Sequence, residues 1–113
     1  MKDDTVYLRH IQECIRRIEE NVAEGRERFM SSHTLQDAVL RNLQTMAEST
    51  QHLSEDLQAA HPEVEWHRIV AFRNVLVHDY LGIDMERIWQ ITQRDVPELK
   101  RAILTILEKG NAP

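Results

Sequence analysis

Length, composition and charge limit what this chain can be. Its 113 residues suffice for one domain with one hydrophobic core, and the balance of 42% hydrophobic to 29% charged residues is that of an ordinary soluble globular domain. The formal net charge of −5 argues against a generic nucleic-acid binder, which normally carries a basic excess, although a cleft on an acidic protein can still be locally basic.

Two long amphipathic helices are predicted in the first half of the chain. The first runs from about residue 4 to about residue 28, with a gap at Gly25, on an apolar stripe of Leu8, Ile11, Ile15, Ile18, Val22 and Phe29. The second has Thr34 as its N-cap and a stripe of Leu35, Val39, Leu43, Met46, Thr50, Leu53 and Leu57. Because both stripes repeat near seven residues, we expect an antiparallel pair in a bundle.

A third helix is predicted to start at Pro62, with Glu63 and Glu65 favourable at its positive end, and to stop at Gly82. From residue 69 to residue 81 it is apolar on nearly every side. Such a helix is buried on every side, which requires either a central position or a second chain against its outer face.

Two shorter helices complete the prediction. Asp84 can cap a helix around Trp89, and Asp95 with Glu98 looks like a capping pair for a final helix that stops at Gly110. No alternating strand pattern occurs. The fold class is therefore all-α, an up-and-down bundle of four to five helices in one domain spanning residues 1–113.

The single cysteine and the start of the chain give an expectation about the cellular compartment. Cys14 cannot form an internal disulfide, sits in a helical pattern and is expected to be a small buried hydrophobe. The start Met1-Lys2-Asp3-Asp4 lacks the apolar run of a signal peptide, and no stretch approaches the length of a membrane span. We expect a cytoplasmic protein.

The third helix breaks its apolar pattern at Arg73, Asn74, His78 and Asp79. Burying a guanidinium without a partner is costly, so Arg73 needs an explanation. In the structural interpretation, Arg73 pairs with Asp79 or another carboxylate and ties the bundle together. In the functional interpretation, it lines a cleft that receives an anion.

The neighbours of Arg73 favour the functional interpretation. His78 is suited to proton transfer near neutral pH, and the Arg73 guanidinium matches a phosphate. Asn74 precedes His78 by four residues and can contact its imidazole, and Tyr80 adds a hydroxyl. His78 could take the proton from a 2′-OH while Arg73 stabilises charge on the phosphate, which would cleave RNA without a metal or cofactor. The other five histidines lack the spacing of a metal pair.

Helix geometry sets a condition on this site. Arg73 and His78 are five residues apart, roughly 140° around an ideal α-helix. Either a π-bulge widens the helix between them, or two chains together complete the site. A two-fold dimer through the third helix is the favoured solution, because it would also bury the outer apolar face.

The motif Arg73-Asn74-x-x-x-His78-x-Tyr80 resembles the R-x4-H-x-Y motif of HepT toxins in the HEPN superfamily. The resemblance covers nearly the whole chain, including Leu35-Gln36-Asp37-Ala38-Val39 and Val96-Pro97-Glu98-Leu99. One departure is Ala47-Glu48-Ser49, where a sequence closer to Gly-Glu-Ala is expected.

The resemblance implies a helical homodimer, the toxin of a type VII toxin–antitoxin system, that acts as a metal-independent endo- or exoribonuclease. Arg73 and His78 would be catalytic, with Asn74 and Asp79 supporting them. The implied partners are RNA and a minimal nucleotidyltransferase antitoxin of the MntA type, which would transfer AMP to Tyr80, in a complex that can exceed a dimer. AMP would add bulk and negative charge at the cleft between the two chains.

A second interpretation is a non-catalytic HEPN module whose groove holds a nucleotide or the partner nucleotidyltransferase. The net charge of −5 favours it, whereas an intact Arg73–His78 pair favours the nuclease, since a pure binder does not need that pair. A helical scaffold without any site is the third alternative.

Overall fold

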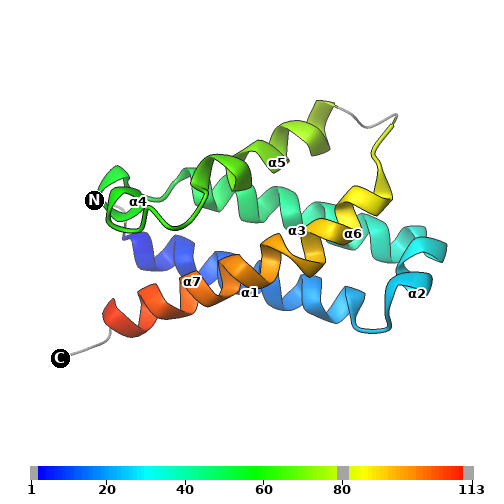
Figure 1. The fold of residues 1–113 in the computed structure, drawn as a ribbon, viewed down its shortest axis with the longest axis horizontal. Coiled ribbons are helices and arrows are strands. Elements are labelled where there is room, and N and C mark those ends of the chain that lie inside the picture. Colours follow the sequence, from blue (N-terminus) through cyan, green and yellow to red (C-terminus); the bar gives the residue numbers. More distant parts are fainter. Residues whose placement is uncertain (1–2, 79–81, 111–113) are drawn as a thin grey trace.

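The computed structural model describes residues 3–78 and 82–110, with side chains described for all of these except residues 75–78 and 110. Within these ranges the chain is all-α, which confirms the predicted fold class (Figure 1). The helices are α1 (Asp4–Val22), α2 (Arg26–Ser31), α3 (His33–Gln51), α4 (Glu55–Ala60), α5 (Trp66–His78), α6 (Met85–Gln93) and α7 (Asp95–Gly110). Five of them are long enough to form the bundle, and the six-residue helices α2 and α4 connect its members.

The first predicted helix is divided in two by Gly25. Helix α1 ends at Val22, and Gly25 adopts a φ of 97°, a conformation that L side chains rarely adopt. The chain then turns into α2, which places Phe29 fully inside the core. The expectation of one helix through residue 28 was therefore wrong, because the backbone at Gly25 leaves the helical region.

The second predicted helix is also divided. Its N-cap is Ser32 and not Thr34, since the Ser32 hydroxyl accepts a hydrogen bond from the Leu35 amide at 3.2 Å. Helix α3 stops at Gln51, and Ser54 caps the new helix α4. The carboxylate of Asp4 accepts hydrogen bonds from the amide and the hydroxyl of Ser54, which joins this break to the start of α1. The prediction of one helix through Leu57 was wrong.

The third predicted helix starts later than expected. Helix α5 begins at Trp66 and not at Pro62. The buried Trp66 indole donates from Nε1 to the carbonyl oxygens of Gln58 and His61, at 3.2 and 3.0 Å, and so fixes the turn that leads into α5. The side-chain burial predicted for residues 75–81 lies outside the described residues.

The last two helices begin as predicted, but only one of the two predicted caps is correct. Asp84 caps α6 by accepting from the amides of Glu86 and Arg87. Asp95 is the first residue of α7, but its carboxylate is buried and accepts from Arg68, so it forms no capping pair with Glu98.

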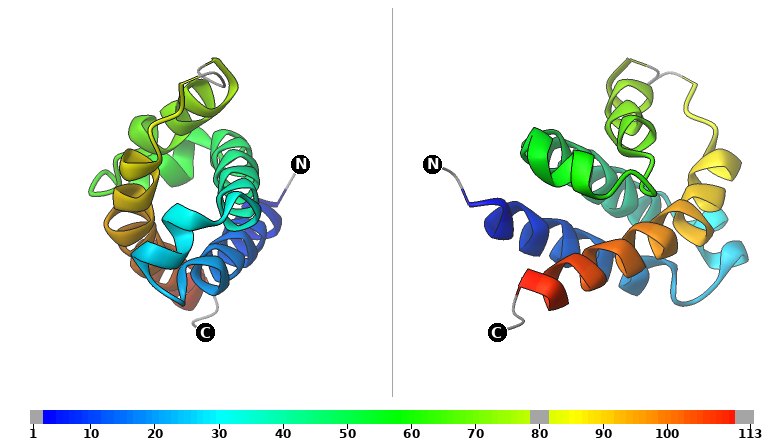
Figure 2. Two further views of the ribbon diagram at one scale, coloured as in Figure 1. Left: turned by 90° about the vertical axis from the view of Figure 1, so that its right-hand side faces the viewer. Right: turned by 60° about the vertical axis from the view of Figure 1, so that its left-hand side comes forward.

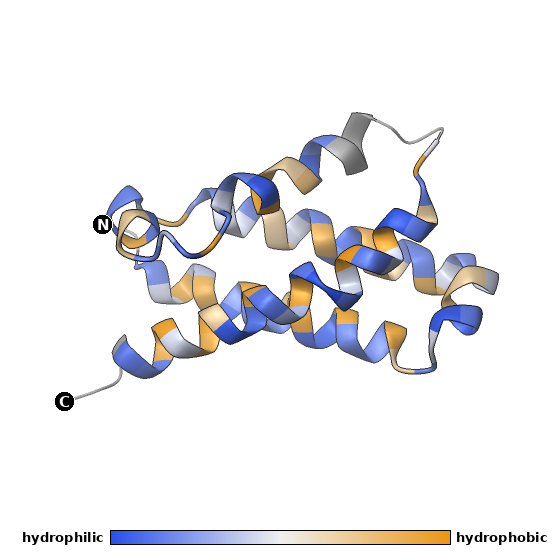
Figure 3. Ribbon diagram, in the orientation of Figure 1, coloured by the Kyte–Doolittle hydropathy of each residue, from blue (hydrophilic) through white to orange (hydrophobic). Residues whose placement is uncertain are grey.

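The apolar faces of the helices meet in one core, which includes Ile11, Ile18, Leu43, Met46 and Ile103. Each helix alternates apolar and polar residues along its length (Figure 3). Helix α1 packs on α3 and α7, and α6 packs on α7. The described part of α5 packs closely on α3 but only sparsely on α6 and α7. Two further views show α5 on the side of α3 that faces away from α1 (Figure 2). No helix within the described ranges is long and apolar enough to cross a membrane.

Candidate functional site

Helix α5 carries the motif and is an uninterrupted α-helix from Trp66 to His78. No π-helical turn lies between Arg73 and His78. The two positions are therefore about 140° apart around the helix axis, as an ideal helix requires. Of the two geometries expected from the sequence, the widened helix is wrong for this chain, and the site completed by a second chain stays a prediction.

Arg73 is exposed and carries its charge into solvent. Its Nη1 donates a hydrogen bond at 3.3 Å to Oε1 of Gln51, the last residue of α3. This partner is a neutral amide, and no described carboxylate forms an ion pair with Arg73. The predicted structural role, a tie to a carboxylate within the bundle, is thus not found among the described residues, while Asp79 lies outside them.

The other motif residues are described only in part. Asn74 is exposed on α5, beside Arg73. His78 is the last residue of α5, and its side chain is not described, so the contact expected between Asn74 and the imidazole stays a prediction. Asp79 and Tyr80 lie outside the described residues.

A groove runs between α5 and the pair α6 and α7, where packing is sparse. One ion pair crosses it: Arg68 on α5 donates from Nε and Nη2 to the two carboxylate oxygens of Asp95, at 2.7 and 3.3 Å. The carboxylate holds the pKa of the Arg68 guanidinium above its ordinary value through this hydrogen bond. The sequence pattern does not single out Arg68, since an exposed arginine at a helix start gives no signal of a partner 27 residues later.

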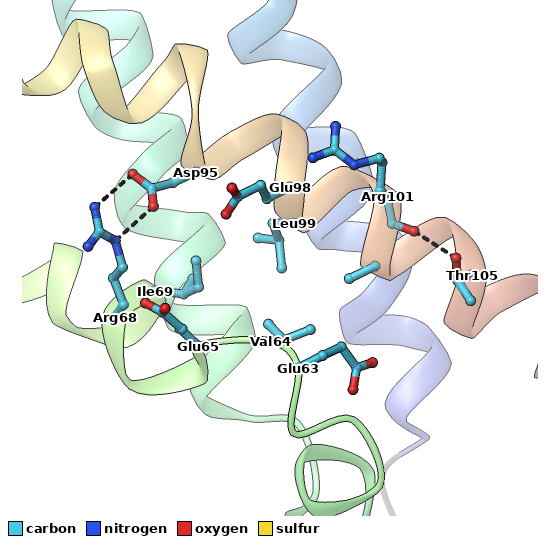
Figure 4. Close-up of a pocket in the computed structure, with 11 residues that line it drawn as sticks. Glu63, Val64, Glu65, Arg68, Ile69, Asp95, Glu98, Leu99, Arg101 and Thr105 are labelled. Atoms are coloured by element: carbon cyan, nitrogen blue, oxygen red, sulfur yellow. Dashed lines mark hydrogen bonds and ion pairs between the residues drawn. The ribbon is translucent and has the colours of Figure 1, made fainter.

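The Arg68–Asp95 pair separates two cavities of about 320 Å³ each, which we call the acidic half and the basic half of the groove. The acidic half lies between the start of α5 and α7, where Glu63, Glu65 and Glu98 surround an apolar floor (Figure 4). The basic half lies between the middle of α5 and α6 and carries Arg87 and Arg94.

A second polar cluster lies between α1 and α3. His10 Nδ1 and the buried Ser49 hydroxyl are hydrogen-bonded at 2.5 Å, and His10 Nε2 is 3.8 Å from the Cys14 sulfur. Cys14 is buried, as predicted, and also contacts the Thr45 hydroxyl at 3.3 Å. Burial raises the pKa of the Cys14 thiol, which disfavours the reactive thiolate. This cluster gives Ser49, one of the two residues that depart from the expected Gly-Glu-Ala, a partner on α1.

Within the described ranges, no group of three or more His, Cys, Asp or Glu side chains is placed to hold a metal ion. Arg73, Asn74 and the groove arginines offer hydrogen-bond donors and positive charge, which suit an anion such as a phosphate.

Comparison with known proteins identifies the family. The sequence profile described as "Ribonuclease HepT-like" matches residues 11–106, most of the chain. The chain belongs to the HepT-like ribonuclease family. The match includes α5 and the motif from Arg73 to Tyr80, and it confirms the resemblance found in the sequence.

Several relatives of this HepT-like chain carry names of the same kind. A protein of Thermococcus cleftensis named "Probable ribonuclease HepT" is 35% identical, over 83% of this chain and 86% of the relative. The "mRNA nuclease HepT" of Shewanella oneidensis is 24% identical, over 82% of this chain and 87% of the relative.

A longer relative comes from Methanocaldococcus jannaschii. It is named "Gamma-glutamylcyclotransferase and putative RNase" and is 34% identical over 96% of this chain, which spans 49% of the length of that relative. No solved structure matches the chain significantly.

Proposed function

We propose that this HepT-like chain is a metal-independent ribonuclease and the toxin half of a toxin–antitoxin pair. Membership of the family and the names of the Thermococcus and Shewanella relatives support RNA as the substrate. The observation that carries the proposal is the state of Arg73: it is exposed, and among the described residues its guanidinium contacts only a neutral amide. The described residues therefore leave its charge available for a phosphate.

Four residues of the motif take part in the proposed cleavage reaction. His78 takes the proton from a ribose 2′-OH, and the freed oxygen attacks the adjacent phosphorus. Arg73 stabilises the negative charge that grows on the phosphate oxygens. The bond to the 5′-oxygen breaks, that oxygen takes up a proton, and the strand ends in a 2′,3′-cyclic phosphate. Asn74 and Asp79 support the imidazole and guanidinium.

The site is proposed to form between two copies of the chain. The uninterrupted α5 helix supports this, because the positions of Arg73 and His78 are about 140° apart around its axis. A two-fold axis beside α5 would bring Arg73 of one copy toward His78 of its mate. The same axis would give two equivalent sites in each dimer.

The test is cleavage of RNA by the purified protein in the presence of EDTA. The wild type is expected to cleave, and Arg73→Ala and His78→Ala are expected to lose about 10²-fold or more of the activity, the usual contribution of one acid–base or charge-stabilising group. His67→Ala is the matched control, since His67 is an exposed histidine on the same helix. Binding of RNA without cleavage would favour the non-catalytic module, and full activity of His78→Ala would refute the proposed chemistry.

Neutralisation is proposed to occur by transfer of AMP to Tyr80 from a partner nucleotidyltransferase. An AMP group there would add bulk and negative charge at the proposed site between the two chains and repel the phosphates of RNA. The chain contains only two tyrosines, Tyr7 and Tyr80, so the test has an internal control. Co-expression with the partner is expected to raise the intact mass of the wild type and of Tyr7→Phe by AMP, but not that of Tyr80→Phe. Modification of Tyr80→Phe would place the AMP elsewhere.

A further inference from the structure

The basic half of the groove is unusual for this chain. The protein carries a formal net charge of −5, yet Arg68, Arg87 and Arg94 line one cavity of about 320 Å³ together with a single carboxylate, Asp95. That carboxylate is already bonded to Arg68. The cavity therefore keeps two positive charges that the described residues do not neutralise.

Arg87 and Arg94 are arranged along one line. They are seven residues apart, at the first turn and the C-cap of α6, so they lie near the same face and about 10 Å apart along the helix axis. Both are exposed, and neither forms an ion pair with a described carboxylate. Five of the other nine arginines do form such pairs: Arg16, Arg17, Arg26 and Arg28 with glutamates, and Arg68 with Asp95.

The residues around the basic half determine where along α5 an anionic strand can lie. Phe72 on α5 and Ile91 on α6 are buried and close its base. The acidic half begins beyond the Arg68–Asp95 pair, and there Glu63, Glu65 and Glu98 outnumber Arg101, so this half repels a polyanion (Figure 4). A bound anionic strand is thus excluded from the start of α5 and kept beside its later part, the segment that carries the motif.

We infer that the basic half of the groove binds the phosphate backbone of the RNA strand, with Arg87 and Arg94 each contacting one phosphate. The guanidinium fork matches phosphate oxygens, and such contacts position a strand without reading its sequence. This inference rests on the proposed RNA substrate and adds a binding surface outside the motif. It also explains how an acidic protein holds a polyanion, since the positive charge is concentrated beside α5.

The experiment measures binding separately from cleavage. The probe is a short fluorescent single strand whose 2′-OH groups are methylated, so the proposed nucleophile is absent and the strand stays intact. Its affinity is followed by fluorescence anisotropy against salt concentration for the wild type and for the double variant Arg87→Ala, Arg94→Ala. Loss of two phosphate contacts reduces the slope of log affinity against log salt by about 1.4. Between about 50 and about 200 mM salt the wild type then loses roughly sevenfold more affinity than the variant.

Two controls isolate the groove. Arg9→Ala, Arg28→Ala removes the same charge from exposed positions on α1 and α2 and is expected to leave the slope unchanged. Arg87→Lys, Arg94→Lys keeps the charge and is expected to retain the slope. Thermal unfolding of each variant confirms that it is folded.

The outcomes separate this inference from the proposed function. An unchanged slope in the folded alanine variant overturns the phosphate site, even if the wild type cleaves RNA. An equal loss in the Arg9 and Arg28 control also overturns it, because net charge alone would then explain the binding. Dependence on Arg87 and Arg94 without any cleavage would instead keep the site and refute the nuclease.

Discussion

Asp95 is almost completely buried and accepts two hydrogen bonds from the half-exposed guanidinium of Arg68. This pair links the described part of α5 to α7 by hydrogen bonds, and it stands between the acidic and basic halves of the groove. It therefore ties the helix that carries the motif to α7, in addition to the packing of that helix on α3.

Removing Arg68 should destabilise the fold. Arg68→Ala leaves the Asp95 carboxylate buried without its partner, which is expected to lower the free energy of unfolding by about 1–3 kcal/mol. The loss is smaller than for a fully buried pair, because solvent screens the half-exposed guanidinium. Urea unfolding measures it. The double variant Arg68→Met, Asp95→Leu should recover part of the loss, and a stable Arg68→Ala would contradict this role of the pair.

The hydrogen bond between His10 and Ser49 should couple these two residues energetically. Ser49→Ala is expected to cost about 0.5–1.5 kcal/mol, since it removes a hydrogen bond from a buried position. In the His10→Ala background the same change should cost much less. A double-mutant cycle from urea unfolding gives the coupling energy, and a value near zero would show that the contact does not stabilise the pairing of α1 with α3.

Gly25 should resist replacement for a backbone reason alone. Its φ of 97° is a conformation that L residues rarely adopt, while a Cβ at this position would meet no atom within 4 Å. Gly25→Ala is therefore expected to lower the free energy of unfolding by about 1–3 kcal/mol through strain, without any clash. Ala23→Gly, at the right-handed C-cap of α1, is the control and should cost less. Thermal unfolding measures the stability of both variants. Equal stability of Gly25→Ala and the wild type would show that an alanine at this position is not strained.

Complementation can test whether two chains complete the site. Arg73→Ala and His78→Ala should each be inactive alone, but mixing and refolding them should restore about a quarter of the wild-type activity. In a two-fold dimer, half of the random pairs are mixed, and each mixed pair has one intact site. RNA cleavage before and after mixing measures this. If the two residues act within one chain, every site in the mixture keeps a defect and no activity returns.

The pattern of apolar residues was sufficient to predict the helical class, because burial of a stripe depends on residues three and four apart on the same helix. The stripe of Leu8, Ile11, Ile15 and Ile18 is buried in α1 as predicted, and Asp84 caps α6. The boundaries at Val22, Gln51 and Trp66 were not predicted. They depend on the φ of Gly25, on the Asp4–Ser54 contact and on the Trp66 indole, all of which involve conformations or partners that a local pattern does not contain.

The motif itself came from the sequence, since the residue types Arg73, His78 and Tyr80 and their spacing are written in one short segment. The sequence also showed that five residues separate Arg73 from His78, and it favoured a second chain over a widened helix as the way to bring them together. The tertiary structure removed the widened helix, because α5 is regular from Trp66 to His78, and the second chain stays a prediction. It alone also revealed the groove with its acidic and basic halves. Arg68 and Asp95, or Phe72 and Arg87, become neighbours only when distant helices pack together.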